Sequence, residues 1–319
     1  MSLKVAVLAG GDSAESAISR SSAGEVLLSL GKRHLVELIE LDENITKNIT
    51  AFAPDVVFPV LHGPPGEDGT VQGYLEMLGI PYVGSDVRGS SLAMDKYVAK
   101  TLFREAGLPV LEDLLVSVAD AHESSAAISE RFGMRVVIKP LRQGSALGVT
   151  RLPNGGDVSQ SIIDAQRYGD TVLVEPYFEG KEVTAGVLDL DGENTVVFPV
   201  TEIELPDGEW YDFRNRYEAG RSVHKIPASL PDHVLEDIAN YATRAHECLG
   251  LRDLSRSDFL VSSTNEVVLL EVNTMPGMTP TSLYPDAARA AGWSFGDLVD
   301  KLVVNAMSRT TKVSYPRGV

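Results

Sequence analysis

Two carboxylates in the last quarter of the chain, Asp258 and Glu271, have the types and spacing that point most directly to chemistry. Apolar runs at 258–261 and 268–272 flank a turn-rich segment, which is typical of a β-hairpin. A turn centred near 264–265 pairs Asp258 with Glu271 and Phe259 with Leu270. Alternation of side chains then places four polar residues on one face: Arg256, Asp258, Glu271 and Asn273. The opposite face carries the core residues: Phe259, Val261, Val268, Leu270 and Val272.

Two opposed carboxylates in a half-buried sheet repel each other, because little water screens them. A hard divalent cation relieves this repulsion. The oxygen-only set of Asp258, Glu271 and Asn273 suits Mg²⁺ that is coordinated jointly with phosphates. The alternative is a solvated carboxylate face on an antiparallel hairpin.

The segment 138–149 is predicted to form a strand, a glycine-rich loop and a second strand. We interpret the loop as one that covers the phosphates of a bound ligand. Lys139 ends the first strand and can offer a point charge, while Gly144, Ser145 and Gly148 let backbone amides approach an anion. The order of a Walker loop is absent, and no helix follows directly. The alternative is a plain hairpin connection. A second lysine, Lys96, and the acidic pair Asp258 and Glu271 imply a bound nucleotide, so we favour a loop that covers its phosphates over a plain hairpin connection.

The first strand, 4–8, ends near Gly10 and Gly11, which suggests dinucleotide binding. That fingerprint requires a third glycine near position 15, where Glu15 stands. We therefore favour a substrate loop in which Glu15 holds a substrate ammonium group. The alternative role for Glu15 is helix capping and stabilisation of the first helical turn.

The segment 62–69, His-Gly-Pro-Pro-Gly-Glu-Asp-Gly, follows a buried strand and is too polar and turn-rich for a core. It should line a surface cleft. A lone histidine such as His62 is more often a hydrogen-bonded structural residue than a catalyst, although its place at the carboxyl end of a strand adds some support for a functional role.

A third group of residues is typical of a nucleobase site and of a loop that closes over the active site. Strand 171–175 runs through Glu175 into a proline, a geometry that suits an adenine site, and Glu182 is placed to hold ribose hydroxyls. The aromatic, charged loop 210–220 has the length of a lid. In it Arg216 is placed to meet phosphate, and Tyr217 to close on the substrate. The alternative is an exposed surface loop that does not close over a site.

The elements that must position these residues change in kind along the chain. The first part alternates strands (4–8, 35–41, 56–61) with helical stretches (19–30, 75–78), which predicts a parallel α/β domain with functional loops at the carboxyl ends of its strands. A helix over 94–106, closed by Gly107, should place Val98, Leu102 and Phe103 in a core.

The rest predicts an α+β pattern. Its strands are 136–139, 149–152, 171–175, 183–188 and 195–200, and its helices are 158–168, 235–249 and 294–307. A polar loop spans 207–222. We divide the chain into an N-terminal α/β substrate domain (1–90), a central subdomain (91–174) and a C-terminal subdomain with the metal and acceptor sites (175–319).

Composition is that of a globular protein, with 44% hydrophobic and 23% charged residues in 319. The net charge of −17 argues against general nucleic-acid binding and against binding to an anionic membrane surface. The single cysteine, Cys248, excludes an intramolecular disulfide and fits a reducing compartment. No leader or membrane-spanning run is evident, so we expect a soluble cytoplasmic protein.

In order along nearly the whole length, the chain resembles the D-alanine–D-alanine ligase family of the ATP-grasp superfamily. The resemblance is carried by AVLAGGDSAES, HGPPGEDGT, YVGSDVRGSSLAMDK, IKPLRQGSALGV, EPYFEGKEVTAGV, YDFRNRYEAG, RSDF and EVNTMPGMTPTSLYP. It implies a three-domain ATP-grasp architecture, with ATP held between the central and C-terminal domains, and it suggests a homodimer.

The resemblance also implies roles for individual residues. Those that serve ATP would be Lys96, Lys139, Glu175, Glu182 and Arg216, with the backbone of Tyr177 and Phe178 at the adenine and Trp210 beside it. Those that hold two Mg²⁺ ions, with Mn²⁺ as an alternative, would be Asp258, Glu271 and Asn273. Glu15 would bind the ammonium of the first amino acid, in one network with Ser145 and Tyr217. His62 would contact substrate. Arg256 and the Gly277 amide would form the oxyanion site, and Ser282 with the Leu283 amide would take the second carboxylate.

Some positions depart from the family pattern. Arg216 stands where lysine is common, Gln143 where an acid is common, Ala17 where a second acid is common, and Phe213 where tyrosine is common. These departures leave the fine substrate specificity open. Ligases that make a D-alanyl-D-lactate ester usually lack a tyrosine at the position of Tyr217, although the nearby His224 keeps that variant open.

The expected reaction is ATP-dependent ligation of two D-alanine molecules through an acyl phosphate, for peptidoglycan precursors. Three alternatives remain. One is an ATP-grasp ligase that acts on other amino acids, joining or cyclising them, or on D-lactate. Another is a non-catalytic nucleotide-binding module, and the intact set of Arg256, Asp258, Glu271 and Asn273 argues against it. The last is a dinucleotide-dependent oxidoreductase, which the missing glycine argues against.

Overall fold

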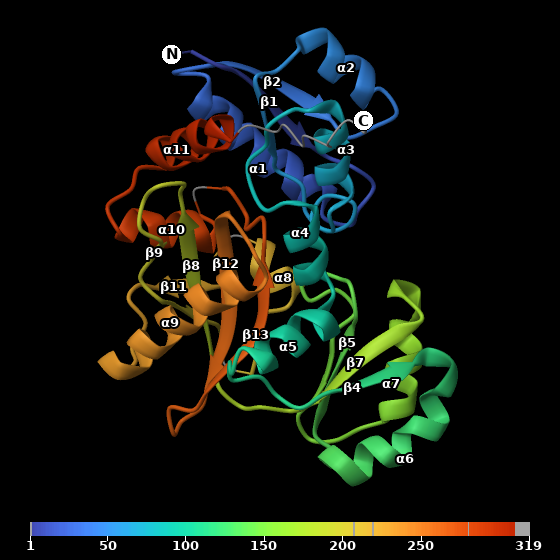
Figure 1. The fold of residues 1–319 in the computed structure, drawn as a ribbon. Coiled ribbons are helices and arrows are strands. Elements are labelled where there is room, and N and C mark those ends of the chain that lie inside the picture. Colours follow the sequence, from blue (N-terminus) through green and yellow to red (C-terminus); the bar gives the residue numbers. More distant parts are fainter. Residues whose placement is uncertain (1, 207, 219, 280, 310–319) are drawn as a thin grey trace, which may run out of the picture.

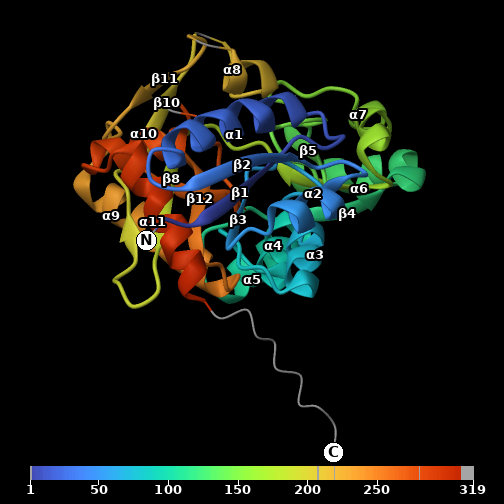
Figure 2. The same ribbon diagram turned by 90° about the horizontal axis from the view of Figure 1, so that it is seen from above.

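The computed structural model describes residues 2–206, 208–218, 220–279 and 281–309, which form three β-sheets with their own helices (Figure 1). Met1, Asp207, Ala219, Pro280 and residues 310–319 lie outside the described residues. The first residue of the predicted polar loop and one residue of the predicted lid fall among them. Seen from above, the N-terminal sheet lies across the other two, with α9 (Asp232–Cys248) and α11 (Phe295–Ser308) on one side and α6 (Ala121–Phe132) and α7 (Val158–Asp164) on the other (Figure 2).

Sheet A, in the N-terminal part, is parallel, as the alternation of strands and helices predicted. Its strand order is β2-β1-β3, with β1 (Lys4–Ala9), β2 (Leu35–Glu40) and β3 (Val56–Pro59). One face packs against α1 (Ser16–Leu30) and the C-terminal α11 (Phe295–Ser308). The core on the other face includes residues of α2 (Ile45–Phe52) and α3 (Thr70–Leu78). Because β1 is buried on both faces, its sequence is a continuous apolar run.

Sheet B is antiparallel with the order β4-β7-β5-β6, and it carries the predicted phosphate loop between β5 and β6. Its strands are β4 (Leu114–Ser117), β5 (Val136–Pro140), β6 (Thr150–Leu152) and β7 (Thr171–Pro176). The helical segments that accompany it are η1 (Val118–Asp120), α6 (Ala121–Phe132), α7 (Val158–Asp164) and η2 (Ala165–Tyr168). Apolar residues of α6 and α7 share one core with the sheet.

Sheet C is antiparallel with the order β11-β10-β8-β12-β13, and β9 pairs with β8. Its strands are β8 (Lys181–Asp189), β9 (Val196–Val197), β10 (Thr201–Glu204), β11 (Val223–Lys225), β12 (Asp253–Val261) and β13 (Val267–Asn273). The later helices are α8 (Phe213–Tyr217), α9 (Asp232–Cys248) and α10 (Leu283–Ala290). Helices α9 and α5 share the core of this sheet.

The β12–β13 hairpin confirms one half of the predicted register. Asp258 pairs with Glu271, and Arg256 with Asn273. The predicted pairing of Phe259 with Leu270 is wrong, because a bulge after Asp258 brings Phe259 opposite Leu269. The inserted residue moves Leu270 out of the apolar face, so Leu269 takes its place in the core.

The predicted helix over 94–106 is confirmed as α5 (Lys96–Glu105), which begins two residues later than predicted because a separate helix, α4 (Val87–Met94), ends just before it. Asp95 between them is extended, and its side chain accepts from the Val98 amide at 3.1 Å, which caps α5. Val98 is therefore at the start of the helix and only partly buried, while Phe103 reaches the core as predicted.

Two further predictions about the C-terminal half need correction. The expected strand 195–200 is ordered as a strand only at Val196–Val197, and the next strand begins at Thr201. The polar loop is not wholly irregular, since Asp212 caps the short helix α8 by accepting from the Asn215 amide at 2.8 Å.

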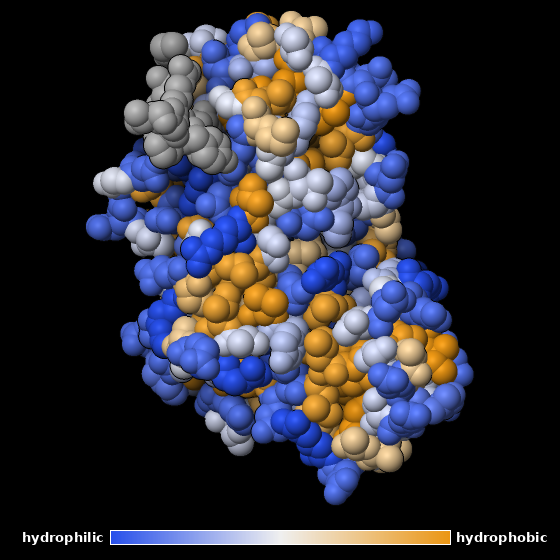
Figure 3. Space-filling view, turned by 45° about the vertical axis from the view of Figure 1, so that its right-hand side comes forward, coloured by the Kyte–Doolittle hydropathy of each residue, from blue (hydrophilic) through white to orange (hydrophobic). Residues whose placement is uncertain are grey.

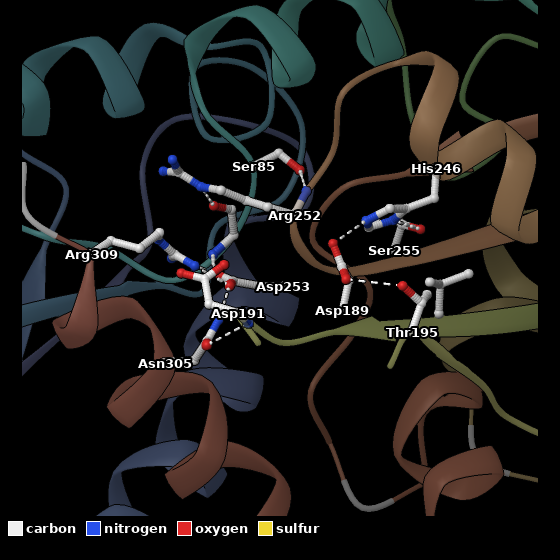
Figure 4. Close-up of polar contacts among 12 residues, drawn as sticks. Ser85, Asp189, Asp191, Thr195, His246, Arg252, Asp253, Ser255, Asn305 and Arg309 are labelled. Atoms are coloured by element: carbon white, nitrogen blue, oxygen red, sulfur yellow. Dashed lines mark hydrogen bonds and ion pairs between the residues drawn. The ribbon is translucent and has the colours of Figure 1, made fainter. Parts of the chain in front are cut away.

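A buried polar cluster joins the N-terminal part to the C-terminal part (Figure 4). Asp253, fully buried at the start of β12, has a left-handed φ of 65°. Its carboxylate accepts from the Gly84 amide at 2.6 Å, Asn305 Nδ2 at 2.7 Å and Arg309 Nη2 at 2.6 Å. Arg252 donates to the Gly84 carbonyl at 2.8 Å. Three distant segments thus meet at one carboxylate, three residues before Arg256.

We expect Asp253→Asn to lower the free energy of unfolding by about 3 kcal/mol, because Arg309 loses its buried counter-ion. Asparagine tolerates the left-handed backbone, so the change isolates the charge. Urea denaturation measures it. Lys301→Met is the control, since it breaks only the half-exposed pair with Glu193 and should cost less than about 1 kcal/mol. Equal stability of the two variants would contradict the assignment.

On the face shown in Figure 3, hydrophobic residues form separate patches among hydrophilic ones. The large exposed apolar side chains come from all three sheets and their helices, with Leu28, Leu115 and Val223 as examples. Among the described residues, no helix is both long enough and apolar enough to cross a membrane.

Candidate active site

Two cavities lie where the three sheets meet. The narrow cavity, about 100 Å³, lies between sheets B and C. The wide cavity, about 780 Å³, adds the loops that follow β1 and β3 of sheet A. Tyr211 and Arg216 line both. The two cavities are therefore neighbours that share a wall.

The structure brings all eight residues predicted for the nucleotide to the narrow cavity. They are Lys96, Lys139, Glu175, Tyr177, Phe178, Glu182, Trp210 and Arg216. They come from helices α5 and α8, from strands β5, β7 and β8, and from the segments after β7 and before α8. These segments are far apart in sequence, and only the packing of sheet B against sheet C unites them.

Lysines and carboxylates alternate along one side of the narrow cavity. Lys139 Nζ lies 2.5 Å from Glu175 Oε2, and Lys96 Nζ lies 3.2 Å from Glu271 Oε2. Burial alone would raise the pKa of Glu175, yet the two lysines that contact it hold its pKa at about 2. Lys96 also donates to the Gln143 carbonyl at 2.6 Å. This side can bind a polyanion.

The other side of the narrow cavity is aromatic. Arg151 donates to the Tyr177 hydroxyl at 2.8 Å, and its guanidinium lies 5.2 Å from the Trp210 ring centroid. Leu260 and Leu270 complete the lining, so the bulge that displaced Leu270 from the core gives it to this cavity. A flat, apolar slot with a polar rim suits a nucleobase.

The polar face of the hairpin connects the cavities. Arg256 donates to both oxygens of Asp258, at 2.8 and 2.9 Å, and Thr184 Oγ1 donates to Asp258 Oδ1 at 2.8 Å. Glu271 lines the narrow cavity and Asn273 the wide one. Asp258 lines neither in the described part of the chain, because the Arg256 guanidinium covers it.

The donor set fits Mg²⁺. Asp258, Glu271 and Asn273 supply oxygens from neighbouring register positions. Burial would raise the pKa of Glu271, but Lys96, Arg216 and Lys139 hold its pKa at about 2, so it is ionised. Within residues 2–206, 208–218, 220–279 and 281–309, no group of three or more Asp, Glu, His or Cys is placed to hold a metal. A cation here would complete its shell with phosphate oxygens or water.

In the wide cavity, three predicted residues meet: Glu15 just before α1, Ser145 in the loop between β5 and β6, and Tyr217 at the end of α8. Ser145 Oγ and the Tyr217 hydroxyl lie 2.5 Å apart, and both donate to Glu15 Oε1, Tyr217 at 3.0 Å. Burial raises the pKa of Tyr217, so its phenol keeps its proton and remains a donor. Glu15 is buried, and within the described part of the chain both of these donors reach the same oxygen, so its second oxygen can accept from a further donor.

The predicted acceptor residues form the opposite end of the wide cavity. Ser282 precedes α10 and receives a hydrogen bond from the Thr279 amide at 3.2 Å, and Leu283 begins the helix. A Cβ on Gly277 would lie 2.8 Å from Ser282 Oγ, so a larger residue at this position would displace the Ser282 hydroxyl. The amino end of α10 therefore faces a cavity that suits an anion.

His62 reaches the wide cavity as predicted, and it has an acidic neighbour that the prediction passed over. Glu67 Oε2 accepts from the Gly63 amide at 2.7 Å, and both side chains also hydrogen-bond the backbone of Met275. Burial lowers the pKa of His62, while burial and then Glu15 raise the pKa of Glu67 to about 8. The loop after β3 is thus connected to the segment before α10 through the protonated side chain of Glu67.

Glu67→Gln should change the pH dependence of stability. The native pKa of about 8 lies above the unfolded value, so the native state binds more protons and wild-type stability falls as pH rises from about 4.5 to about 8. Glutamine removes this loss, which amounts to roughly 5 kcal/mol at most. Thermal unfolding from pH 5 to 9 measures it. Glu236→Gln, at an exposed site on α9, is the control and should leave the pH profile unchanged.

One arrangement resembles a catalytic triad without being a site. His246 Nδ1 lies 2.8 Å from Ser255 Oγ, and its Nε2 lies 3.5 Å from Asp189 Oδ2 (Figure 4). Ser255 is fully buried and lines neither cavity of the described residues. No substrate could reach it, so these residues stabilise the junction between α9 and sheet C.

Sequence reasoning missed several residues at the cavities. Arg151 gave a signal, because it stands on the strand that follows the phosphate loop, and Glu67 lay inside a segment already singled out. Asp286 was also missed; it lines the wide cavity beside His224, which the family resemblance had already brought in, with 2.7 Å between His224 Nδ1 and Asp286 Oδ2. That contact joins β11 to α10 and has no local sequence signal.

Comparisons with known proteins agree over most of the chain. The family described as D-ala D-ala ligase N-terminus matches residues 42–85, and the one described as D-ala D-ala ligase C-terminus matches residues 102–304. A D-alanine–D-alanine ligase of Moorella thermoacetica is 43% identical over 306 residues, covering 94% of this chain and 98% of that protein.

Two solved structures are similar throughout. The D-alanine–D-alanine ligase of Bacillus anthracis complexed with ATP has a TM-score of 0.82 at 26% identity, covering 96% of this chain and 98% of that one. The VanG D-Ala:D-Ser ligase of Enterococcus faecalis has a TM-score of 0.80 at 31% identity, covering 96% of this chain and all of the other.

Proposed function

Because the chain belongs to the D-alanine–D-alanine ligase family, an ATP-dependent ligase family, we propose that it joins two D-alanine molecules through an acyl phosphate in the two cavities described above. ATP would occupy the narrow cavity, and both amino acids the wide one. The observation that carries this proposal is that all eight residues predicted for the nucleotide line one cavity, which shares Tyr211 and Arg216 with the other.

The first step is attack of the first D-alanine carboxylate on the γ-phosphate, which gives the acyl phosphate and ADP. Glu15 holds the ammonium group of this substrate, and Ser145 and Tyr217 fix the orientation of Glu15. Lys139 and Arg256 neutralise the charge that spreads over the phosphoryl group. Asp258, Glu271 and Asn273 would hold two Mg²⁺ ions, with Mn²⁺ as an alternative, and a bound cation supplies further charge neutralisation at the phosphates.

The second step joins the substrates. The amine of the second D-alanine loses a proton and attacks the acyl carbon, and phosphate leaves. Arg256 and the Gly277 amide stabilise the oxyanion of the tetrahedral intermediate, while Ser282 and the Leu283 amide hold the second carboxylate. The segment from Trp210 to Gly220 excludes water from the acyl phosphate, which would otherwise hydrolyse.

Several wider features belong to the same proposal. The dipeptide would serve peptidoglycan precursor synthesis in the cytoplasm, and the protein would act as a homodimer. We also propose the division into a substrate domain (1–90), a central subdomain (91–174) and a C-terminal subdomain (175–319), with ATP between the last two.

The test is a product assay. With ATP, Mg²⁺ and D-alanine, we expect ADP and D-alanyl-D-alanine in equal amounts, detected by a coupled ADP assay and by mass spectrometry. L-alanine is the control and should give no dipeptide. ADP release without dipeptide, or no ADP release, would contradict the proposal.

A second candidate differs only in the second substrate. It is supported by the similarity to the D-Ala:D-Ser ligase and by the polar pair of His224 and Asp286 beside the acceptor end of the wide cavity. Adding D-serine or D-lactate to the same assay separates the two. A mixed product in excess over D-alanyl-D-alanine would favour the second candidate.

A further inference from the structure

A second buried lysine lies behind the wall of the narrow cavity. Lys100 follows Lys96 by four residues on α5, so both side chains leave the same face of the helix. Lys96 lines the narrow cavity, whereas Lys100 lines neither cavity of the described residues and is 2% exposed. Lysine is almost never buried to this degree unless it is paired. Its partners therefore indicate what it does.

Lys100 contacts two buried acids. Its Nζ donates to Glu175 Oε1 and lies 3.2 Å from Asp113 Oδ2. Arg104 also donates to Asp113, at 2.6 Å. Since Lys139 contacts the other oxygen of Glu175, each oxygen of this carboxylate has its own lysine. The two lysines differ in position, because the Lys139 side chain is 14% exposed at the cavity wall and that of Lys100 is 2% exposed behind it.

This difference matters when a nucleotide arrives. In the proposed function Lys139 binds a phosphate of ATP, so it must leave Glu175 or share its charge. A buried carboxylate without a counter-ion is strongly unfavourable. With Lys100 in place Glu175 keeps one partner, and Lys100 is too deeply buried to follow the phosphate. Without Lys100, Glu175 would hold Lys139 as its only counter-ion.

We propose that Lys100 is a positioning residue of the nucleotide site, which remains the counter-ion of Glu175 and so leaves Lys139 free to bind the phosphates of ATP. The inference rests on the proposed function, because it assumes that ATP occupies the narrow cavity. The proposal implies that Lys100 contributes to the affinity for the phosphates of ATP and not to the affinity for the nucleoside.

Calorimetric titration of the full chain with ATP and, separately, with adenosine tests this. For Lys100→Met the dissociation constant of ATP should rise at least about tenfold, because the phosphates must compete with Glu175 for Lys139. That of adenosine should change less than about threefold. Arg104→Met is the matched control, since Arg104 contacts Asp113 but not Glu175, and it should leave both constants unchanged. An equal loss for adenosine, or none for ATP, would overturn the proposal.

A second comparison removes any effect on folding. In a Glu175→Gln background there is no carboxylate to neutralise, so adding Lys100→Met should change ATP affinity less than about twofold. A tenfold further loss in that background would overturn the proposal, even if the single Lys100→Met variant does not fold.

The binding measurements use no amino acid and no turnover, so they are independent of the product assay. If the wild type makes the dipeptide but Lys100→Met binds ATP as tightly as the wild type, the inference fails and the proposed function stands. If the titrations follow the prediction but no dipeptide forms, the proposed ligation fails and the role of Lys100 stands.

Discussion

Arg256→Met should lower kcat for ADP release about a thousandfold, the largest effect that we expect from a single substitution. Arg256 is buried, lines the wide cavity and is held by two hydrogen bonds to Asp258. In the proposed mechanism the positive charge of Arg256 stabilises the negative charge that develops in both steps. Little water is present at this position to supply the same stabilisation. KM for ATP should change much less than kcat, because the loss falls on the transition states.

The measurement is a steady-state ADP assay with D-alanine, together with thermal unfolding to show that the variant folds. Arg214→Met is the control, since Arg214 is exposed on the neighbouring helix α8 and contacts Glu218. It should retain activity within about twofold. A folded Arg256→Met variant with activity near that of the control would remove Arg256 from the mechanism.

Glu271→Gln should raise the Mg²⁺ concentration for half-maximal activity at least about tenfold and lower kcat about a hundredfold. The change keeps the shape of the side chain and removes its charge. Glu271 lines the narrow cavity and is paired with Lys96 at 3.2 Å, so its loss also leaves that lysine with only the Gln143 carbonyl. Both consequences weaken the hold on the phosphates and the cation.

Titration of ADP release with Mg²⁺ at saturating ATP measures this effect. Glu266→Gln lies in the exposed turn of the same hairpin and is the control, with an unchanged Mg²⁺ dependence expected. If Glu271→Gln needs no more Mg²⁺ than the control, Glu271 is not a metal ligand, and its role is limited to pairing with Lys96.

The hairpin illustrates how far sequence pattern reaches. Alternation of polar and apolar residues was enough to pair Asp258 with Glu271 and Arg256 with Asn273, because side chains on a strand alternate with period two. The same rule failed at the next residue, Phe259. The bulge after Asp258 inserts one residue, and nothing in the pattern of 267–270 distinguishes Leu269 from Leu270, since both are apolar.

The start of the predicted helix over 94–106 was placed two residues too early for a related reason. Residues 87–105 are mostly helix formers, so propensity favours continuity across Asp95. The break comes from capping, since the Asp95 side chain satisfies the amide of Val98 and turns the chain. The new axis of α5 is what aims Lys96 and Lys100 at Glu271 and Glu175, on two different sheets.

Sequence alone determined the kinds of groups in this protein and their local order: a parallel N-terminal sheet, a lysine before a glycine-rich loop, and two carboxylates that face each other across a hairpin. Those features follow from interactions between residues close in the chain. Tertiary structure decided which of them meet, how deeply each charge is buried, and which lysine is free to move. Glu15, Ser145 and Tyr217 come together across 202 residues, and Lys100 differs from Lys139 only in depth. Depth and distant contact depend on how three sheets pack, and no local pattern encodes that.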